Sequence, residues 1–391
     1  MSQFGHASKS LQYFRDTANM QKIKVKSGVD KSEFQRVVFD RGIKNSFQKE
    51  VNRKVNAYFQ SNNIATTANT HMVIKSIIII AGWAGTYGLI LFSGWEPWIL
   101  LLLALTHGFF MAMLGLNVGH DAIHGSYSKM PWLNKLLGLS FNLVGANDYV
   151  WSISHNIVHH SYTNIPDHDE DLNQPFFLRI EPTQKLRKIH RFQHVYAYFL
   201  YGLATISWVF VKDYKKFFQR KLGGHYRKTL PRKEIFRLFF YKILYYFLFL
   251  ALPIALIDLP WYSVLGGFFL AHFVGGFIMA VIFMLAHIVE ETSYPLPKKD
   301  GKVDLTWADL QMYTTCNFAV DNKVVNNLFG GLNFQIEHHL FPKVCHIHYP
   351  NIHNIVRETA HEHGLPYLEH STFSGAISSH TRALRKFGRF A

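Results

Sequence analysis

Four long apolar stretches constrain the fold of this 391-residue chain more than any other feature of its sequence. They run over residues 74–92, 98–118, 236–257 and 262–286. Each approaches or exceeds the roughly 20 residues that a helix needs to cross the hydrocarbon core of a bilayer. Because "SGWEP" joins the first two and "DLPW" joins the last two, they form two helical hairpins. The sequence therefore predicts an all-α integral membrane protein with four transmembrane helices.

The positive charges lie outside these hairpins. The net charge is +15, yet neither hairpin link contains a Lys or Arg, whereas both terminal segments and the central segment are basic. By the positive-inside rule, both termini and the central segment are expected to be cytoplasmic. The basicity then reports topology, and no nucleic-acid partner is expected. No apolar segment precedes a cleavage site in the polar N-terminal region, so no signal peptide is expected.

Weaker patterns divide the rest of the chain. Residues 1–73 form a cytoplasmic N-terminal region, in which Phe34, Val37, Val38, Phe47, Val51 and Val55 predict one amphipathic helix or a pair within residues 30–62. The main domain spans residues 74–357, and residues 358–391 form a C-terminal tail. The short apolar segments 132–146 and 195–211 are predicted to be helices that lie in the membrane interface. Cys316 and Cys345 provide neither a disulfide framework nor a Cys-x-x-Cys site.

Histidines gather beside the spans at spacings typical of metal sites. They occur as His120 and His124 in "GHDAIHG", His155, His159 and His160 in "SHNIVHH", His287 in "LAHIVEET", and His338 and His339 in "QIEHHLF". Histidines four apart on a helix share a face, whereas adjacent ones diverge by about 100°. One small ion cannot easily be held by both members of an adjacent pair, but two ions can. The spacing therefore predicts a dinuclear centre.

The predicted topology brings all eight imidazoles to the cytoplasmic face, provided that segment 195–211 does not cross the membrane alone. An all-imidazole set suits iron, copper, zinc or nickel. Eight ligands exceed what one tetrahedral zinc ion uses, and two irons fit the number while leaving room for water or O2. Ligand histidines usually donate their second N–H to an oxygen, and we expect Asp121 and Asp169 to accept such bonds. Gln335 is expected to orient substrate or oxygen beside the metals, or to be a weak ligand.

The remaining histidines have less specific settings. A surface position is expected for His190, His194, His225, His361, His363 and His370, and a surface or outer-shell position for His168. His346 and His348 follow the last box closely and are weaker candidates for contact with the site. Within the spans, His107 and His272 lie about 20 Å from the histidine cluster. They are expected either to bond between helices, or to pair or cap the far end of a substrate tunnel.

The motifs H-x3-H, H-x3-HH and Q-x2-HH around four spans resemble the membrane fatty acid desaturases. "HDAIHGSYS", "HNIVHHSYTNIPDHDEDL", "LAHIVEET" and "NFQIEHHLFPKVCHIHYP" carry the resemblance, which runs from about Ser32 to Arg357. The Gln of the third box is similar to that of the front-end type, which includes linoleoyl-CoA (delta-6) desaturase-like proteins. The resemblance implies a di-iron centre held by the eight histidines, and an acyl-CoA or acyl-lipid substrate in a tunnel among the spans.

Two departures from related desaturases affect what is expected. Some front-end enzymes carry a fused cytochrome b5 domain with a His-Pro-Gly-Gly motif, which this sequence lacks. Electrons are therefore expected from a separate ferredoxin or cytochrome b5-like donor, as in a bacterial enzyme of the inner membrane. Phe283 also stands where stearoyl-CoA desaturases have an Asn near the metals, so that coordination scheme does not transfer in full.

Desaturation removes two hydrogens from adjacent unactivated methylenes, which no side-chain acid or base can do, so iron, O2 and external electrons are required. A lipid hydroxylase or ketolase of the same metal class remains an alternative, although "QIEHH" favours desaturation. A metal transporter is the alternative from another class. Transporters place their binding groups near the bilayer midplane, whereas these histidines lie at or beyond the predicted helix ends.

Overall fold

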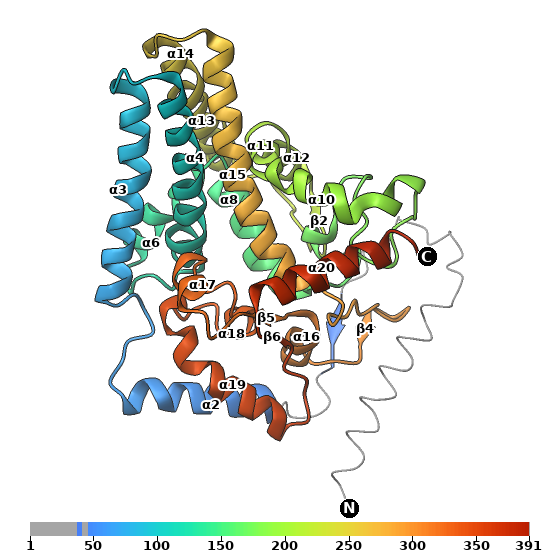
Figure 1. Ribbon diagram of the computed structural model, residues 1–391. Helices are drawn as coiled ribbons and strands as arrows, with labels where there is room; N and C mark the ends of the chain where they lie inside the picture. The colour runs from blue at the N-terminus through green and yellow to red at the C-terminus, as the bar shows by residue number, and fades with distance from the viewer. Residues whose placement is uncertain (1–36, 41–45, 391) are drawn as a thin grey trace, which may run out of the picture.

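The computed structural model describes residues 37–40 and 46–390, which form a mostly helical protein (Figure 1). Four helical stretches are long and apolar enough to cross a membrane: Thr70–Phe92, Pro97–His124, Arg232–Leu256 and Trp261–His287. They stand as two hairpins with their short links at the top of Figure 1. The prediction of four candidate spans is therefore confirmed, with each helix a few residues longer at one or both ends than its apolar pattern.

Capping residues and prolines set the ends of these helices. The side chain of Asn69 accepts a hydrogen bond from the backbone N–H of Met72 at the start of the first span. Pro97 occupies the first turn of the second span, where its missing N–H costs nothing. The spans comprise α3 (Thr70–Phe92); α4 (Pro97–Met113), the π-helix η1 (Leu114–Gly119) and α5 (His120–His124); α13 (Arg232–Tyr246), the π-helix η6 (Phe247–Ala251) and α14 (Leu252–Leu256); and α15 (Trp261–His287).

Short helices connect the two hairpins. After the second span come α6 (Pro131–Gly138), α7 (Ser140–Leu143), α8 (Asp148–Trp151), the π-helix η2 (Ser152–His159), α9 (His160–Tyr162) and the 3-10 turn η3 (Glu170–Leu172). They are followed by η4 (Lys188–Phe192), α10 (Gln193–Gly202), α11 (Ala204–Ser207), the π-helix η5 (Trp208–Lys212) and α12 (Asp213–Phe218). The halves Lys188–Gly202 and Ala204–Phe218 are apolar enough to span only as a pair, and they are bent by 61°. That this segment does not cross alone stays a prediction.

The chain after α15 covers the lower end of the spans in Figure 1. It contains α16 (Trp307–Thr314), α17 (Lys323–Leu328), α18 (Gln335–Leu340), the 3-10 turn η7 (His346–His348), α19 (Tyr349–Glu362) and α20 (Phe373–Phe387). The described residues include three two-residue strand pairs, of which two join distant segments and one, β2 with β3, is a local hairpin. β1 (Val38–Phe39) is parallel to β4 (Lys302–Val303), β2 (Lys221–Leu222) is antiparallel to β3 (His225–Tyr226), and β5 (Asn317–Phe318) is parallel to β6 (Glu369–His370).

Both terminal segments pack on the main body. The amphipathic prediction is correct for α2 (Ser46–Ser61), whose buried Phe47, Val51 and Val55 pack against α19. It is wrong for Val38, which lies in β1 because the backbone of this strand pairs with β4, and Phe34 lies outside the described residues. Residues 358–391, set apart above as a tail, include α20, which packs against α10 and α15.

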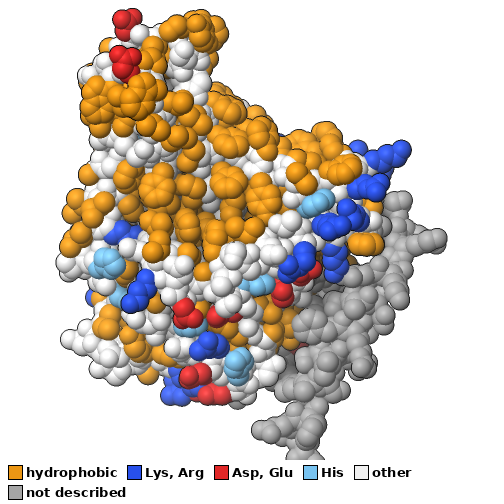
Figure 2. Space-filling model, in the orientation of Figure 1, with side chains coloured by type: hydrophobic (Ala, Val, Ile, Leu, Met, Phe, Trp, Pro, Cys, Tyr) orange, Lys and Arg blue, Asp and Glu red, His pale blue; other side chains and the backbone are white. Residues whose placement is uncertain are grey.

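The surface separates into an apolar part and a charged part. Figure 2 shows hydrophobic side chains over most of the upper part of the visible face, while most Lys, Arg, Asp and Glu side chains lie below. Ile77, Ile78 and Phe236 are among the span residues that are more than half exposed. An exposed apolar band of this kind suits contact with lipid, because exposing so much apolar surface to water would cost free energy. The charged side chains of the lower end suit contact with water.

Candidate metal centre

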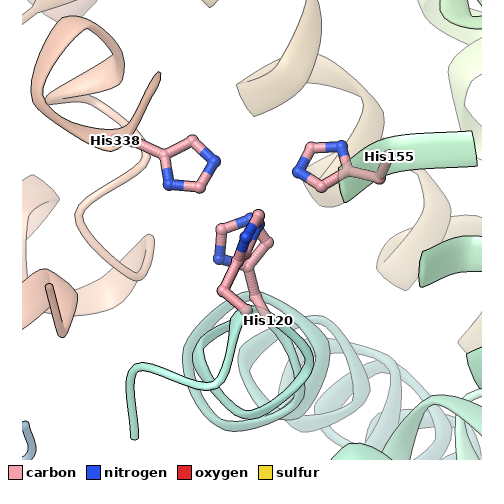
Figure 3. Close-up of side chains that lie close together, drawn as sticks. His120, His155 and His338 are labelled. Carbon is pink, nitrogen blue, oxygen red and sulfur yellow. The ribbon is translucent and has the colours of Figure 1, made fainter. Parts of the chain in front are cut away.

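All eight box histidines converge at the lower end of the spans, and each is at most 5% exposed. They come from four parts of the chain: α5, η2 with α9, the last residue of α15, and α18. Figure 3 shows His120, His155 and His338 entering from three separate elements with their rings turned toward one another. The ring centroids of His120 and His338 are 4.6 Å apart, although more than half of the chain lies between these two residues. The structure thus brings together every histidine that was predicted as a ligand.

Irregular backbone positions two of these elements. The π-helix η1 leads directly into His120, and the π-helix η2 contains His155 and His159. π-bulges are uncommon and occur frequently at functional sites, where the extra residue per turn redirects side chains. The loop before α18 contains Gly330 and Gly331, both in the left-handed region with φ of +62° and +64°. A Cβ on Gly330 would lie 2.2 Å from a backbone oxygen of η1, so only glycine allows this loop to approach so closely.

The ring nitrogens fall into two main groups, within each of which one nitrogen per residue lies within 4.8 Å of the others. Group one contains His120, His124, His155 and His338, and group two contains His159, His287 and His339. His160 lies between them: its Nε2 is 3.3 Å from Nε2 of His155, and it forms a further close set with His338 and His339. The pair 338–339 is therefore divided between the two groups.

The geometry and the donor set fit metal ions. Buried ring nitrogens of His120, His124, His160, His338 and His339 have no hydrogen-bond partner among the described residues. Such orphaned atoms are costly unless something else satisfies them. The Nε2 atoms of His159 and His287 are 3.3 Å apart. Two imidazole nitrogens bound to one ion at about 2.0–2.1 Å are separated by about 3.0–3.4 Å, depending on the ligand angle. Histidine clusters of this kind can bind metal.

The outward nitrogens of group two and of His338 meet oxygen atoms. Nδ1 of His159 lies 3.0 Å from Asp169, and Nδ1 of His287 lies 3.2 Å from the backbone oxygen of Thr314. Those oxygens can only accept, so Nδ1 carries the proton and Nε2 keeps its lone pair toward the cluster. The same arrangement holds for Nδ1 of His339 with Oε1 of Gln311 at 2.8 Å, while Nδ1 of His338 lies 3.3 Å from the Tyr349 hydroxyl.

Electrostatics keep most of the cluster neutral. Burial, followed by repulsion from neighbouring imidazoles, holds the pKa of His155, His160, His338 and His339 well below the usual value. Burial would also lower the pKa of His159, but its attraction to Asp169 and their hydrogen bond outweigh that effect and raise it. Neutral imidazole is the form that binds metal. The set is therefore prepared for ligation, and Asp169 increases the basicity of one member.

A family model described as fatty acid desaturase matches residues 93–371. The chain belongs to the fatty acid desaturase family. It is 36% identical over 351 residues to an sn-1 linoleoyl-lipid 6-desaturase of Arthrospira platensis, which covers 90% of this chain and 94% of that relative. The corresponding enzyme of Synechocystis sp. is 34% identical over 348 residues, covering 88% of this chain and 96% of the relative.

A third relative, an acyl-lipid (8-3)-desaturase of Physcomitrium patens, is 37% identical over 351 residues, covering 88% of this chain and 72% of the relative. These matches confirm the resemblance to front-end desaturases that the histidine boxes predicted. The protein is an O2-dependent oxidoreductase that introduces double bonds into fatty acyl chains. Desaturation is thus favoured over the hydroxylase, ketolase and transporter alternatives.

A cavity of about 730 Å³ adjoins the desaturase's histidine cluster. His155, His159 and His287 line it together with Phe283, whose ring centroid is 5.6 Å from that of His155. Its wall follows α15 from His287 to Phe269, about 27 Å along the helix axis. Most of the wall comes from α15, the bent pair α10–α12 and residues 169–178, and it is largely apolar. A long hydrocarbon chain suits these walls better than a compact polar substrate does.

Several polar side chains near the cluster have hydrogen-bond partners that the sequence did not predict. Asp121, expected beside a ligand histidine, bonds instead to Nδ1 of His346 at 2.7 Å and to the thiol of Cys345 at 2.9 Å. His346 therefore contacts the side chain of the residue that follows His120, whereas His348 bonds to the backbone oxygen of Thr67. The surface prediction for His190 is wrong: the ring is 2% exposed, because it bonds to the backbone oxygen of Phe176 and caps η4.

The two histidines inside the spans bond to neighbouring helices. His107 lies 3.0 Å from the Thr86 hydroxyl on α3, and His272 lies 2.5 Å from the Tyr245 hydroxyl and 3.0 Å from the Thr205 hydroxyl. Neither lines the 730 Å³ cavity. Their contacts agree with the interpretation that they form hydrogen bonds between helices. Both cysteines are buried and free.

Gln335 lies at the inner face of the desaturase site. Its Nε2 is 3.0 Å from Nε2 of His287, and its Oε1 is buried with no partner among the described residues. The partners Gln311, Thr314 and Tyr349 were not found from the sequence. They do not recur at a characteristic spacing from the histidine boxes, and a single buried amide, carbonyl or hydroxyl leaves no periodic pattern in the sequence. Only the fold brings them to the ligand histidines.

Proposed function

We propose that this desaturase is a di-iron acyl-lipid enzyme of the front-end type, which inserts a cis double bond near the carboxyl end of an acyl chain esterified to a membrane lipid. The observation that carries the proposal is the convergence of eight buried histidines, in two groups, on the wall of a long apolar cavity. The relatives named for acyl-lipid substrates support the choice of an ester-linked lipid.

The proposed ligand assignment follows the two groups. His120, His124, His155 and His338 would hold one iron, and His159, His287 and His339 the other. His160 joins the first set through its contact with His155. When bound, the irons supply the redox chemistry that uses O2 and two electrons to remove two hydrogens from adjacent methylenes.

The protein's own residues position the chain and keep water away. Phe283 and Trp151 form an apolar wall beside His155, so a methylene rather than water occupies the space next to the cluster. Asp169 holds the orientation and tautomer of His159. The amide of Gln335 contacts Nε2 of His287, and its unpartnered Oε1 is available to orient substrate or O2.

The electron donor is proposed to be a separate ferredoxin or cytochrome b5-like protein that approaches from the cytoplasm. The histidine ends of the second and fourth spans lie at the same end of the molecule in Figure 1. The positive-inside rule supports a cytoplasmic position for that end, and we expect the cytoplasm to be that of a bacterium, where a soluble donor is available.

Expression in a host with simple lipids tests this function. The host is supplied with linoleate, and mass spectrometry locates new double bonds separately in the glycerolipid and acyl-CoA pools. A new bond on the carboxyl side of the existing ones, appearing first in glycerolipid, is expected. The variant His159→Ala should make no product and retain less iron. A hydroxylated product, or a purified protein that holds exchangeable zinc and no iron, would contradict the proposal.

A further inference from the structure

Lys216 places a buried ammonium in the wall of the substrate cavity. The residue belongs to α12, is 5% exposed and lines the cavity. Its Nζ lies 3.9 Å from Glu170 and 3.8 Å from Asp171, which is beyond hydrogen-bond length. Within residues 37–40 and 46–390, no hydrogen bond from this Nζ is formed. A buried ammonium has three donors to satisfy, so these donors are available to a ligand in the cavity.

Lys242, a second buried lysine, differs from Lys216 in its hydrogen bonding. Nζ of Lys242 donates to the backbone oxygens of Gly145 and Trp208 at 2.9 and 2.7 Å and pairs with Asp213 at 2.8 Å. All three of its donors are used inside the protein. Lys242 therefore stabilises the fold, whereas Lys216 retains unused donors on a surface that substrate reaches.

The local charge balance indicates what Lys216 would bind. Glu170 and Asp171 offset the positive charges of Lys216 and of Lys212, and all four residues line the cavity. An additional anion at Nζ would be repelled by these two carboxylates, whose oxygens lie 3.9 and 3.8 Å from that atom. A neutral acceptor avoids that repulsion and still receives a charge-assisted hydrogen bond. A carbonyl oxygen of an acyl ester or thioester has this chemistry.

The ammonium of Lys216 lies close to a histidine of the candidate metal centre. Oδ1 of Asp171 is 3.8 Å from Lys216 Nζ, and Oδ2 of the same carboxylate is 3.8 Å from Nδ1 of His159. The ammonium and that imidazole are therefore at most about 10 Å apart, given the dimensions of a carboxylate. An extended carbon chain advances about 1.2 Å per bond, so a carbon five or six bonds beyond the carbonyl lies about 6–7 Å from it. Carbons near the methyl end lie much farther away.

We propose that Lys216 binds the carbonyl of the acyl ester and thereby sets how far along the chain desaturation occurs. This inference rests on the proposed acyl-lipid function and deepens it. Anchoring the carbonyl at this short distance from His159 presents carbons close to the carboxyl end to the cluster. The rest of the chain extends along α15 toward Phe269. Regioselectivity at the front end thus follows from one buried ammonium and the cavity beside it.

A comparison of ester and ether lipids tests the assignment without relying on turnover. The purified holoenzyme is titrated with dilinoleoyl phosphatidylglycerol and with the matching dialkyl ether lipid, which lacks the carbonyl, and binding is followed by native mass spectrometry. A hydrogen bond to a charged donor predicts a preference of roughly tenfold to hundredfold for the ester. Lys216→Met should abolish the preference, Lys216→Arg should keep it, and the exposed control Lys228→Met should leave it unchanged.

The outcomes separate this inference from the function. If the wild-type protein binds ester and ether lipids equally, the Lys216 assignment is overturned, whether or not Lys216→Met folds. Desaturation of both lipids would then leave the proposed function intact. A stronger preference for linoleoyl-CoA than for the lipid ester would keep Lys216 as the carbonyl anchor and overturn the acyl-lipid proposal. Where Lys216→Met is active, its double bonds should spread over several positions, and an unchanged position would contradict the inference.

Discussion

The hydrogen bond between Asp169 and His159 allows a sharp test of the metal assignment. The Asp169 carboxylate is 3% exposed and lies 3.0 Å from Nδ1 of His159. It also accepts the backbone N–H groups of Asn164 and Asp171 at 2.9 and 3.0 Å. Asp169→Asn keeps the size of the side chain but removes its charge and replaces one acceptor oxygen with an NH2 group. That group then faces an N–H donor, so one hydrogen bond is lost and the bond to the imidazole loses its charge assistance.

The expected loss in iron affinity follows from these contacts. A hydrogen bond to a charged group contributes about 1.5–3 kcal/mol and a neutral one about 1 kcal/mol. The difference corresponds to roughly a tenfold loss, and loss of the fixed tautomer extends it toward the roughly 100-fold effects seen for outer-shell partners of metal ligands. Iron per chain is measured by elemental analysis after purification and during titration with a chelator.

The matched control is Asp167→Asn. Asp167 is an exposed carboxylate two residues away in the same loop, and Asn tolerates its left-handed φ of +63°. This variant should retain wild-type iron. Equal iron retention by the Asp169→Asn and Asp167→Asn proteins would refute the reasoning that Asp169 supports a ligand histidine.

Other expected outcomes follow from the same structure. Gln335→His should retain both iron and desaturation, measured by elemental analysis and product yield, because the side chain already reaches the inner face of the cluster; loss of iron would contradict this position. Gly330→Ala should lower the melting temperature in detergent more than Gly364→Ala, since both positions carry the left-handed cost of about 1–2 kcal/mol but only Gly330 adds a clash at 2.2 Å. Burial lowers the pKa of His380 to about 4, so the stability gained from its neutral form is complete above pH 6.5 and is lost as the pH falls toward 4, by about 3 kcal/mol in all. His380→Gln should flatten this part of the pH–melting curve, and an unchanged slope would contradict it.

Much of this desaturase could be predicted because its strongest signals are local. Apolar length alone identifies α15, and spacing alone identifies His155 and His159 as neighbours on one helical face. The positive-inside pattern then predicted that the histidine boxes meet at one end of the spans, and in the fold they do. The π-helical backbone of η2 was not foreseen, yet it preserves the shared face because four residues still make nearly one turn.

The errors concern contacts between residues far apart in the chain. Val38 forms a strand because its partner β4 comes from the segment after the last span, which no periodicity within residues 30–62 reports. Asp121 was assigned to a ligand histidine by proximity in sequence, but His346 reaches it first from the loop after α18. His190 is buried for the same kind of reason, since its acceptor, the backbone oxygen of Phe176, lies in an earlier loop without a regular pattern.

The assembly of one cluster from four separated segments has a consequence for biogenesis. More than half of the chain lies between His124 and His338. At about 5–20 residues per second, roughly 10–40 s pass on the ribosome between the synthesis of the two. During that interval the first hairpin can enter the membrane, but its histidines lack the partners that complete either group. Loading of the proposed irons into the complete site is therefore expected only after His338 and His339 have been synthesised.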